Sequence, residues 1–328
     1  MKIAVLGAGA WGTAVAISLA TRHTVTLWAR SAAQCAAMTG SRINARYLPG
    51  YDFPDALNVS GDLSAALHRS DLALLAVTTA GLRETLQRLK REEPAPPVIW
   101  LCKGFEPGQG KLAHQVYADE LGTTRRCGVL SGPSFAQEVA QGLPTAVTLA
   151  SESAAFAQDT ARALHSRVFR VYSSDDLIGV EVAAAVKNVM AIAAGISDGL
   201  SYGYNARAAL ITRGLAEVTR LGVALGGRSE TFMGLAGAGD LILTCTGDLS
   251  RNRQVGLKLA QGQPLEAILA ELGHVAEGVA TARELQRLAA RLQLDMPITR
   301  AVCRVLADHR EARAAADELL QREPRAEH

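Results

Sequence analysis

A glycine-rich turn near the start of the chain has the spacing of a dinucleotide-binding site. Gly7, Gly9 and Gly12 form a G-x-G-x-x-G pattern that follows an apolar run and leads into a stretch of small residues. In such a site the first glycine permits a tight turn, the second lets the backbone approach a pyrophosphate, and the third allows close packing of helix on strand. The free N–H groups of the following helix would face the anion. The predicted strand before the turn and the helix after it favour dinucleotide binding over an ordinary glycine turn.

The residue expected at the end of the second strand bears on which dinucleotide binds. A fold that binds NAD usually carries Asp or Glu about 20 residues after the glycines, where it binds the ribose 2′-hydroxyl. This chain has Arg30 at that place. A guanidinium favours a 2′-phosphate, so the hypothesis is a preference for NADPH, with NADH also accepted. The alternative, that Arg30 is a solvated surface residue, stays open.

A single lysine interrupts the most apolar segment of the chain. Residues 180–196 are apolar on nearly every side, as expected of a helix at a domain interface, and Lys187 lies in the middle of them. Desolvation lowers the pKa of a lysine toward the range that suits a general acid or base near neutral pH. The lysine could instead extend along the helix until its amine reaches water. The spacing alone favours neither interpretation.

A second glycine-rich stretch carries one carboxylate and is followed by a group of hydrogen-bond donors. Asp240 follows the glycines of residues 234–239, and Arg251 and Asn252 come soon after it. An aspartate can orient or tune a neighbouring lysine, while arginine and asparagine can donate to a phosphate. Taken alone, the stretch is better explained as a glycine turn with a helix-capping aspartate and exposed arginines.

The elements that must position these residues fall into two halves. Before about Ser174, short runs of Val, Leu, Ile and Ala alternate with segments of helical period; the runs are 3–6, 24–28, 72–77, 98–102, 129–130 and 146–150. This alternation predicts an α/β Rossmann-type domain with a parallel-rich sheet. After Ser174 long helical segments predict an all-α domain. The expected domains are residues 1–174, which bind the dinucleotide, and 175–328, which carry the substrate and catalytic groups.

The composition is that of an ordinary globular protein. The 328 residues are 48% hydrophobic and 20% charged, which is enough to build the cores of two domains. The formal net charge is only +2 and aromatic residues make up 5% of the chain. Because neither a strongly basic surface nor a series of stacking rings is indicated, we expect no nucleic-acid partner.

The cysteines and the apolar segments bear on the compartment. Five scattered cysteines form no C-x-x-C pair and no zinc-ligand spacing, as expected of reduced thiols without a metal; they are Cys35, Cys102, Cys127, Cys245 and Cys303. The apolar start resembles a secretory signal, but its three glycines would weaken the helix that such a signal needs. Charged residues interrupt the most apolar segment, so no membrane span is predicted. We expect a cytoplasmic protein with no membrane partner.

Motifs spread along both halves resemble those of the bacterial NAD(P)-dependent glycerol-3-phosphate dehydrogenases. In chain order they are GAGAWGT (7–13), KG (103–104), SGPSFA (131–136), KNV (187–189), NARAALI (205–211), GAGDL (237–241), SRN (250–252) and EG (277–278). No single motif is decisive. Their order and their coverage of both halves make the resemblance far more specific than a lone glycine pattern.

The resemblance implies the reversible reduction of dihydroxyacetone phosphate to sn-glycerol 3-phosphate. It implies NADP as the preferred cofactor, with NAD as the other, and a product that supplies glycerophospholipid synthesis. It implies that Lys187 is the general acid/base, with Asp240 as the second catalytic residue. The implied substrate-binding residues are Lys103, Gly132, Ser134, Lys187, Asp240, Ser250, Arg251 and Asn252. The implied cofactor-binding residues are Gly7, Gly9, Ala10, Trp11, Gly12, Arg30, Lys103, Ala136, Arg251, Val275 and Glu277.

Two positions depart from the family pattern. Ala10 stands where the family often has serine, which could remove a hydroxyl contact to the pyrophosphate, and Arg207 stands where it often has lysine, which keeps the charge.

Two rival functions remain: a Rossmann dehydrogenase of the 6-phosphogluconate or hydroxy-acid type, and a non-catalytic dinucleotide sensor. The GAGDL and SRN segments argue against the first, and the joint presence of Lys187, Asp240 and Arg251 argues against the second. An Ala/Leu-rich helical half is compatible with a homodimer.

Overall fold

The computed structural model describes residues 1–92, 95–123, 126–273, 276–307 and 311–322. The chain divides into two compact units, one made of residues 1–106 and 111–181 and the other of residues 107–110 and 182–328. Residues 107–110 thus belong to the second unit although the sequence on either side of them belongs to the first. The sequence-based domains, 1–174 for the dinucleotide and 175–328 for the substrate and catalytic groups, stay a prediction.

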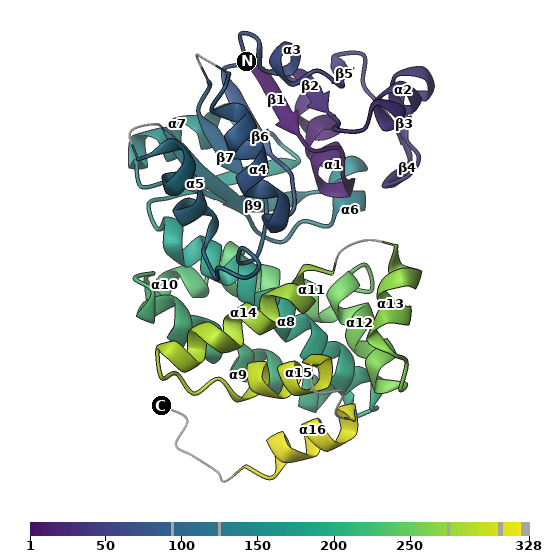
Figure 1. The fold of residues 1–328 in the computed structure, drawn as a ribbon, viewed down its shortest axis with the longest axis vertical. Helices are drawn as coiled ribbons and strands as arrows, with labels where there is room; N and C mark the ends of the chain where they lie inside the picture. The colour runs from purple at the N-terminus through teal and green to yellow at the C-terminus, as the bar shows by residue number, and fades with distance from the viewer. Residues whose placement is uncertain (93–94, 124–125, 274–275, 308–310, 323–328) are drawn as a thin grey trace. The chain divides into compact units, whose positions relative to one another are not determined.

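One eight-stranded sheet forms the centre of the first unit (Figure 1). Its strands are β1 (Lys2–Leu6), β2 (Thr24–Trp28), β5 (Leu57–Ser60), β6 (Leu72–Leu75), β7 (Val98–Trp100), β8 (Cys127–Ser131), β9 (Thr145–Ala150) and β10 (Phe169–Ser174). Their order across the sheet is β10-β9-β8-β7-β6-β1-β2-β5. Every neighbouring pair is parallel except β8 and β9. The predicted Rossmann-type, parallel-rich sheet is therefore confirmed.

Both faces of the central strands are buried. In β1, Ile3 and Val5 belong to the core that includes residues of α1 (Ala10–Ala20) and α7 (Ala154–Leu164). Ala4 and Leu6 point to the opposite face and are also fully buried. The other helices of this unit are α2 (Ala32–Ser41), α3 (Leu63–Leu67), α4 (Thr79–Leu89), α5 (Ala113–Leu121) and α6 (Ala136–Ala140). Burial on two sides explains why the inner strands carry apolar residues on both faces, which made them recognisable in the sequence.

Four strands were not predicted: β3 (Ile43–Asn44), β4 (Leu48–Asp52), β5 and β10. The edge strand β10 alternates: Phe169 and Val171 are buried whereas Arg170 and Tyr172 are exposed. The other edge strand, β5, has only four residues, and β3 and β4 form a separate antiparallel pair. Because edge strands have a solvated side, they lack the continuous apolar run by which central strands are recognised.

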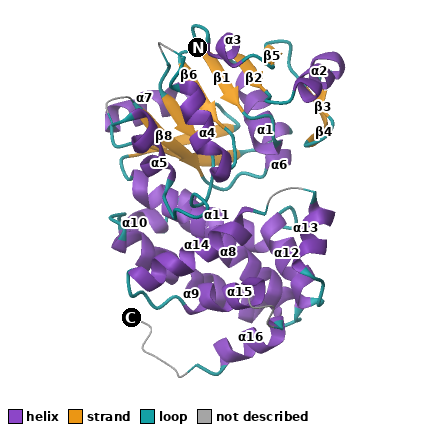
Figure 2. Ribbon diagram, in the orientation of Figure 1, coloured by secondary structure: helices purple, strands orange, loops and turns teal. Residues whose placement is uncertain are grey.

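The second unit is helical throughout the residues that the structure describes, which confirms the predicted all-α half (Figure 2). Its helices are α8 (Leu177–Gly199), α9 (Gly203–Ala224), α10 (Ser229–Phe232), α11 (Asp240–Thr246), α12 (Arg251–Ala260), α13 (Leu265–Leu272), α14 (Glu277–Arg291), α15 (Pro297–Ala307) and α16 (Ala312–Leu320). A π-helical turn, Leu235–Gly239, leads into α11. The first five residues of α8 belong to the first unit.

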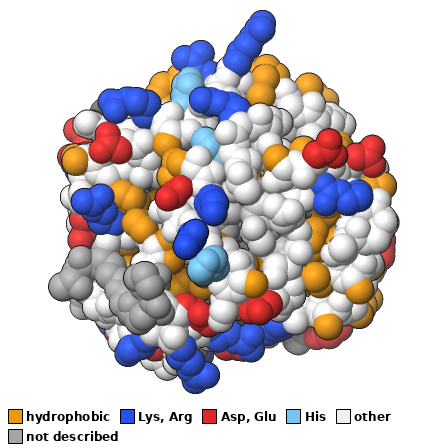
Figure 3. Space-filling view, turned by 90° about the horizontal axis from the view of Figure 1, so that it is seen from above, with side chains coloured by type: hydrophobic (Ala, Val, Ile, Leu, Met, Phe, Trp, Pro, Cys, Tyr) orange, Lys and Arg blue, Asp and Glu red, His pale blue; other side chains and the backbone are white. Residues whose placement is uncertain are grey.

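Helix α8 is long and apolar enough to cross a membrane, and among the described helices it alone meets that test. Within its most apolar 18-residue window, 94% is buried inside the protein. Such burial identifies α8 as a core helix. One face of the molecule carries cationic and anionic side chains intermingled, in keeping with the small net charge of +2 (Figure 3).

Glycines let α8 and α12 approach each other backbone to backbone. A Cβ placed on Gly195 would lie 2.0 Å from the carbonyl oxygen of Arg253, and one on Gly256 would lie 2.1 Å from that of Ile192. No side chain fits at either position. This close approach fixes the start of α12 relative to the helix that carries Lys187.

Candidate active site

The glycine turn has the shape that a pyrophosphate requires. Gly7 has a φ of +121°, and a Cβ there would lie 2.5 Å from the carbonyl oxygen of Ala76. A Cβ on Gly12 would lie 2.1 Å from the carbonyl oxygen of Gly7, so the third glycine is needed for close packing. A Cβ on Gly9 would meet nothing within 4 Å, which leaves its backbone open to a ligand. The turn is therefore tight on two sides and accessible at the middle glycine.

The start of α1 offers polar groups that side chains leave unused. Gly9 is the N-cap of the helix, and no side chain accepts from the first N–H groups, which begin at Ala10. The indole Nε1 of Trp11 is buried and has no hydrogen-bond partner in the described part of the chain. An oriented set of N–H donors at a helix start suits an anion. The residues present thus fit a dinucleotide.

Arg30, just beyond the end of β2, is available for a ligand. Its side chain is 72% exposed and its guanidinium lies 3.5 Å from the carboxylate of Glu84, which also pairs with Arg88 at 2.7 Å. An exposed pair at that distance contributes little to stability. Arg30 can therefore exchange Glu84 for a phosphate at small cost.

Three further predicted residues meet where β7 and β8 end. Lys103 donates from Nζ to the carbonyl oxygen of Gly132 at 3.2 Å, and Ser134 donates from Oγ to the same oxygen at 2.8 Å. Gly132 has a φ of +147°, and a Cβ there would lie 2.9 Å from the Cα of Val147, so glycine is required. Ala136 follows as the first residue of α6, which packs against α1. Ligands of open α/β sheets bind at this carboxyl edge.

Lys187 is buried together with an aspartate and a threonine. Only 6% of the residue is exposed, and its Nζ donates to Oδ1 of Asp240 at 2.5 Å and to Oγ1 of Thr244 at 2.9 Å. Asp240 is 1% exposed and begins α11. The amine therefore does not extend to water, and the aspartate pairs with it inside the unit. A buried ammonium held by a carboxylate and a hydroxyl can keep and release a proton at a fixed position.

The backbone before Asp240 depends on glycine for its path. A Cβ on Gly237, in the π-helical turn, would lie 2.1 Å from the carbonyl oxygen of Phe232. Cys245, next to the lysine site, does not ionise in the neutral range because burial raises the pKa of its thiol to about 12, an effect that the nearby Lys187 opposes. The lysine and aspartate are thus the ionisable pair of this site.

The start of α12 presents one exposed cation beside a buried amide. Ser250 is the N-cap, and its Oγ accepts from the backbone N–H of Arg253 at 3.2 Å. Arg251 is exposed and has no ion pair or hydrogen bond within the described ranges. Asn252 donates from Nδ2 to Oδ1 of Asn188 at 3.1 Å, and its own Oδ1 accepts from the N–H of Gly278 at 3.1 Å. An unpaired guanidinium at a helix start suits a phosphate.

Two predicted cofactor residues remain, Val275 and Glu277. Glu277 is the first residue of α14. Val275 lies outside the described residues. The site groups thus fall into two sets: the glycine turn, Arg30 and the Lys103–Ser134 cluster in the first unit, and Lys187, Asp240, Arg251, Asn252 and Glu277 in the second.

Comparison with known proteins decides the family. A family profile described as NAD-dependent glycerol-3-phosphate dehydrogenase N-terminus matches residues 2–157, and one described as its C-terminus matches residues 176–317. A protein of Thiobacillus denitrificans named glycerol-3-phosphate dehydrogenase (NAD(P)+) is 60% identical over 327 residues, which cover 100% of both chains. The chain belongs to the NAD-dependent glycerol-3-phosphate dehydrogenase family. The resemblance predicted from the motifs is confirmed.

Other members of the glycerol-3-phosphate dehydrogenase family are similar over the same length. The protein of that name from Aromatoleum aromaticum is 57% identical over 328 residues and 100% of both chains. The crystal structure of glycerol-3-phosphate dehydrogenase from Coxiella burnetii has a TM-score of 0.94 and 44% identity, covering 98% of this chain and 99% of that chain. The likeness therefore includes both the sheet and the helical half.

Several groups of this glycerol-3-phosphate dehydrogenase fold were not singled out in the sequence. Thr244 accepts from Lys187, and it lies four residues after Asp240, a helical spacing that could have identified it. Asp198 binds Arg207 at 3.1 Å and Arg253 at 2.8 Å, anchoring α12 to α8. Gly278 belongs to the EG motif, but its hydrogen bond to Asn252 could be found only from the structure, because the donor is a backbone N–H.

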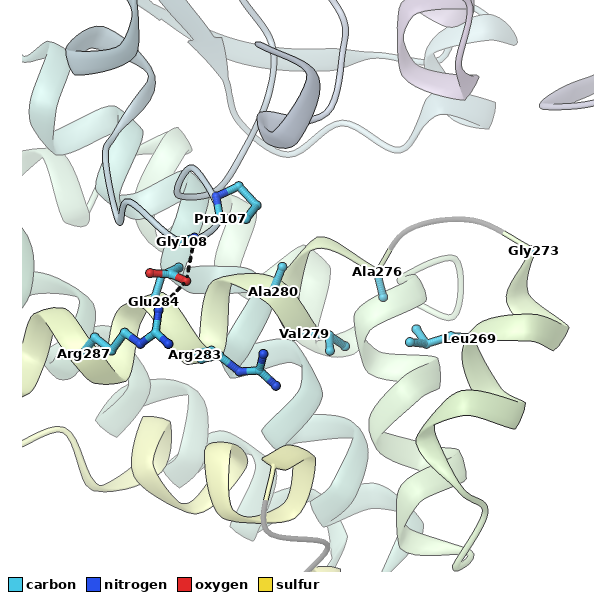
Figure 4. A pocket seen from close by; sticks show the side chains of 10 residues that line it. All are labelled: Pro107, Gly108, Leu269, Gly273, Ala276, Val279, Ala280, Arg283, Glu284 and Arg287. Atoms are coloured by element: carbon cyan, nitrogen blue, oxygen red, sulfur yellow. Dashed lines mark hydrogen bonds and ion pairs between the residues drawn. The ribbon is translucent and has the colours of Figure 1, made fainter. Parts of the chain in front are cut away.

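The second unit also has a groove of about 720 Å³. Its lining includes Val279, Ala280 and Arg283 from α14 and Pro107 from the short segment 107–110 (Figure 4). Its lining includes no residue predicted to bind substrate or cofactor. The candidate site is therefore defined by its chemistry and not by the size of this groove.

Proposed function

We propose that this member of the glycerol-3-phosphate dehydrogenase family reduces dihydroxyacetone phosphate to sn-glycerol 3-phosphate, reversibly, with NADPH preferred and NADH accepted. The observation that carries the proposal is the buried pair of Lys187 with Asp240, supported by Thr244. The family and its close relatives, named for this activity with NAD(P)+, support the same reaction.

The phosphate end of the substrate calls for cationic and N–H donors. Arg251, exposed at the start of α12, and the N–H groups of that helix supply them, while Asn252 offers its second amide hydrogen. Asn188 and Gly278 hold both polar atoms of the Asn252 side chain, so the amide is oriented before substrate arrives. Preorganised donors of this kind bind without the cost of ordering them at each turnover.

The carbonyl end calls for a proton donor. When bound, the dinucleotide supplies the hydride that the carbonyl carbon receives. Lys187 donates a proton from Nζ to the carbonyl oxygen, and Asp240 holds the ammonium in place through the 2.5 Å contact. Thr244 gives the amine a second fixed partner, which limits its rotation. The lysine regains its proton from solvent after the product leaves.

Lys103 and Ser134 complete the proposed set. Both side chains donate to the carbonyl oxygen of Gly132, so two hydrogen-bond donors lie together at the carboxyl edge of the sheet. Ala136 follows closely in the sequence. In the proposal Lys103 exchanges the Gly132 oxygen for the substrate. The protein acts in the cytoplasm as a homodimer and supplies glycerol 3-phosphate to glycerophospholipid synthesis.

The test follows NADPH absorbance with purified protein and dihydroxyacetone phosphate. We expect saturable oxidation of NADPH that depends on dihydroxyacetone phosphate. In the opposite direction, we expect no reduction of NADP+ with 6-phosphogluconate or simple 2-hydroxy acids. A protein that binds NADPH but oxidises it with none of these substrates would be a sensor. Turnover with 6-phosphogluconate and not with the triose would favour the rival dehydrogenase.

A further inference from the structure

Arg83, on α4, binds three carboxylates at once. Its Nε and Nη2 donate to the two oxygens of Glu106 at 2.7 and 2.8 Å, a bidentate pair. Its Nη1 donates to Glu120 at 2.6 Å and its Nη2 also to Asp119 at 2.9 Å. These hydrogen bonds raise the pKa of Arg83 still further above its ordinary value, so the guanidinium stays charged. Three acids thus bind Arg83, and one of them, Asp119, also pairs with Lys111 at 2.6 Å.

Glu106 is the member of this cluster that the fold fixes most firmly. Only 8% of the residue is exposed, and its backbone N–H donates to the carbonyl oxygen of Lys111 at 2.8 Å. Between these two residues the chain makes its excursion into the second unit, where Gly108 donates its N–H to Glu284 at 3.0 Å (Figure 4). Glu106 therefore anchors the base of the loop 107–110 in two ways: its side chain binds Arg83 and its backbone binds Lys111.

Lys103 lies three residues before Glu106 on the same segment. A lysine side chain has many rotamers, so the place of its amine depends on where the backbone holds its Cα. The segment from the end of β7 to Glu106 is anchored by the sheet at one end and by Arg83 at the other. The contact of Arg83 with Glu106 thus helps to hold the backbone of residues 101–106 in place.

We propose that Arg83 is a positioning residue for Lys103, and that it acts through the bidentate pair with Glu106. The inference rests on the proposed function, in which Lys103 binds the substrate. Without Arg83 the buried Glu106 carboxylate would have no cation of its own, since the remaining cation of the cluster, Lys111, pairs with Asp119, and Glu106 would turn outward to water. The backbone that carries Lys103 would move with it, and a shift of about 1 Å can cost roughly a hundredfold in rate.

A double-mutant cycle tests the inference. The variants are Arg83→Met and Lys103→Met, singly and together, with kcat, KM for dihydroxyacetone phosphate and Kd for NADPH measured for each. We expect Arg83→Met to raise KM for the triose about tenfold or more and to change the NADPH Kd less than about twofold. In the Lys103→Met background, Arg83→Met should change KM little further, because the amine that Arg83 positions is already absent.

Two controls separate positioning from a loss of stability. Arg162→Met removes an exposed ion pair with Asp159 in the same unit and is expected to leave KM and kcat unchanged. If Arg83→Met does not fold, the variant Arg83→Met with Glu106→Gln leaves no charged acid at the buried position. It should fold and still show the raised KM, since the anchor remains lost.

The outcomes are distinct. Equal effects of Arg83→Met in both backgrounds, or an unchanged KM, would overturn the positioning role while the triose assay stands. Recovery of the wild-type KM in the paired Arg83→Met, Glu106→Gln variant would also overturn it, because only the charge would then have mattered. A wild-type protein that does not oxidise NADPH with the triose overturns the proposed function itself.

Discussion

At the scale of single residues, the proposed chemistry depends on a buried charge that the protein interior tolerates only when it is paired. Lys187 and Asp240 are almost fully buried, and each satisfies the other. Removing one partner of such a pair leaves an uncompensated charge, which is strongly destabilising. The site is therefore expected to be sensitive to changes that a surface ion pair would tolerate.

Lys187→Ala is expected to lower turnover at least about a hundredfold, the usual range for loss of a general acid, while NADPH binding stays nearly intact. The measurement is kcat with dihydroxyacetone phosphate beside an NADPH titration. Because alanine leaves Asp240 buried without its partner, the paired variant Lys187→Met with Asp240→Asn serves as a control without net charge. Near-normal turnover in both variants would remove Lys187 from the mechanism.

Arg30→Glu tests the cofactor preference. A carboxylate would repel the 2′-phosphate and accept from a ribose hydroxyl, so the ratio of kcat/KM for NADPH over NADH should fall about tenfold or more. Arg88→Glu, one turn from the partner of Arg30, is the matched control and should leave the ratio unchanged. A ratio unaffected by Arg30→Glu would make this arginine a solvated surface residue.

At the scale of elements, the sequence predicts what is local or continuous and misses what depends on neighbours. The buried strands, the glycine turn and α8 have their own patterns of apolar and small residues. Strand β10 does not, because its exposed side interrupts the run. The amide of Asn252 was predicted as a phosphate donor, but its contacts with Asn188 and Gly278 come from helices 64 and 26 residues away. No spacing in the sequence encodes those pairings.

A half-buried histidine links α5 to the start of α8. His114 donates its backbone N–H to Glu181 at 2.9 Å and its ring Nδ1 bonds the other carboxylate oxygen. Burial by itself would lower the pKa of His114, but the hydrogen bond and negative charge of Glu181, with a contribution from Glu152, raise it above its ordinary value. Protonation of the ring therefore favours the folded state.

This linkage has a definite sign. A histidine with a higher pKa in the folded state contributes stability that is fully present below about pH 6.5, its unfolded value, and is lost as pH rises through the folded pKa. The free energy of unfolding, measured with urea at a series of pH values, should thus decline above about pH 6.5. His114→Gln should flatten that decline, whereas His68→Gln, at an exposed position, should not. An unchanged slope in His114→Gln would contradict the linkage.

At the scale of the whole molecule, the alternation of apolar runs and helical segments predicted the two halves. The order of the motifs along both halves predicted the family. The excursion of residues 107–110 could not be predicted in this way. It depends on a contact between Gly108 and Glu284, which are 176 residues apart. Arg83 and Glu106 likewise meet only after the sheet has brought α4 and the end of β7 together.

Binding of NADPH should stabilise the whole chain by mass action. At a free concentration about 100 times its Kd, a ligand that binds only the folded state adds about 2.7 kcal/mol to the free energy of unfolding, which appears as a higher Tm. Gly9→Val should abolish this increase, because the new side chain would occupy the space that a pyrophosphate needs. It should leave the Tm without NADPH near that of the wild type, since a Cβ at Gly9 meets no atom within 4 Å. Gly40→Ala, also at an open position, should respond to NADPH as the wild type does. If Gly9→Val were stabilised by NADPH as strongly as the wild type, the glycine turn would not be where the dinucleotide binds.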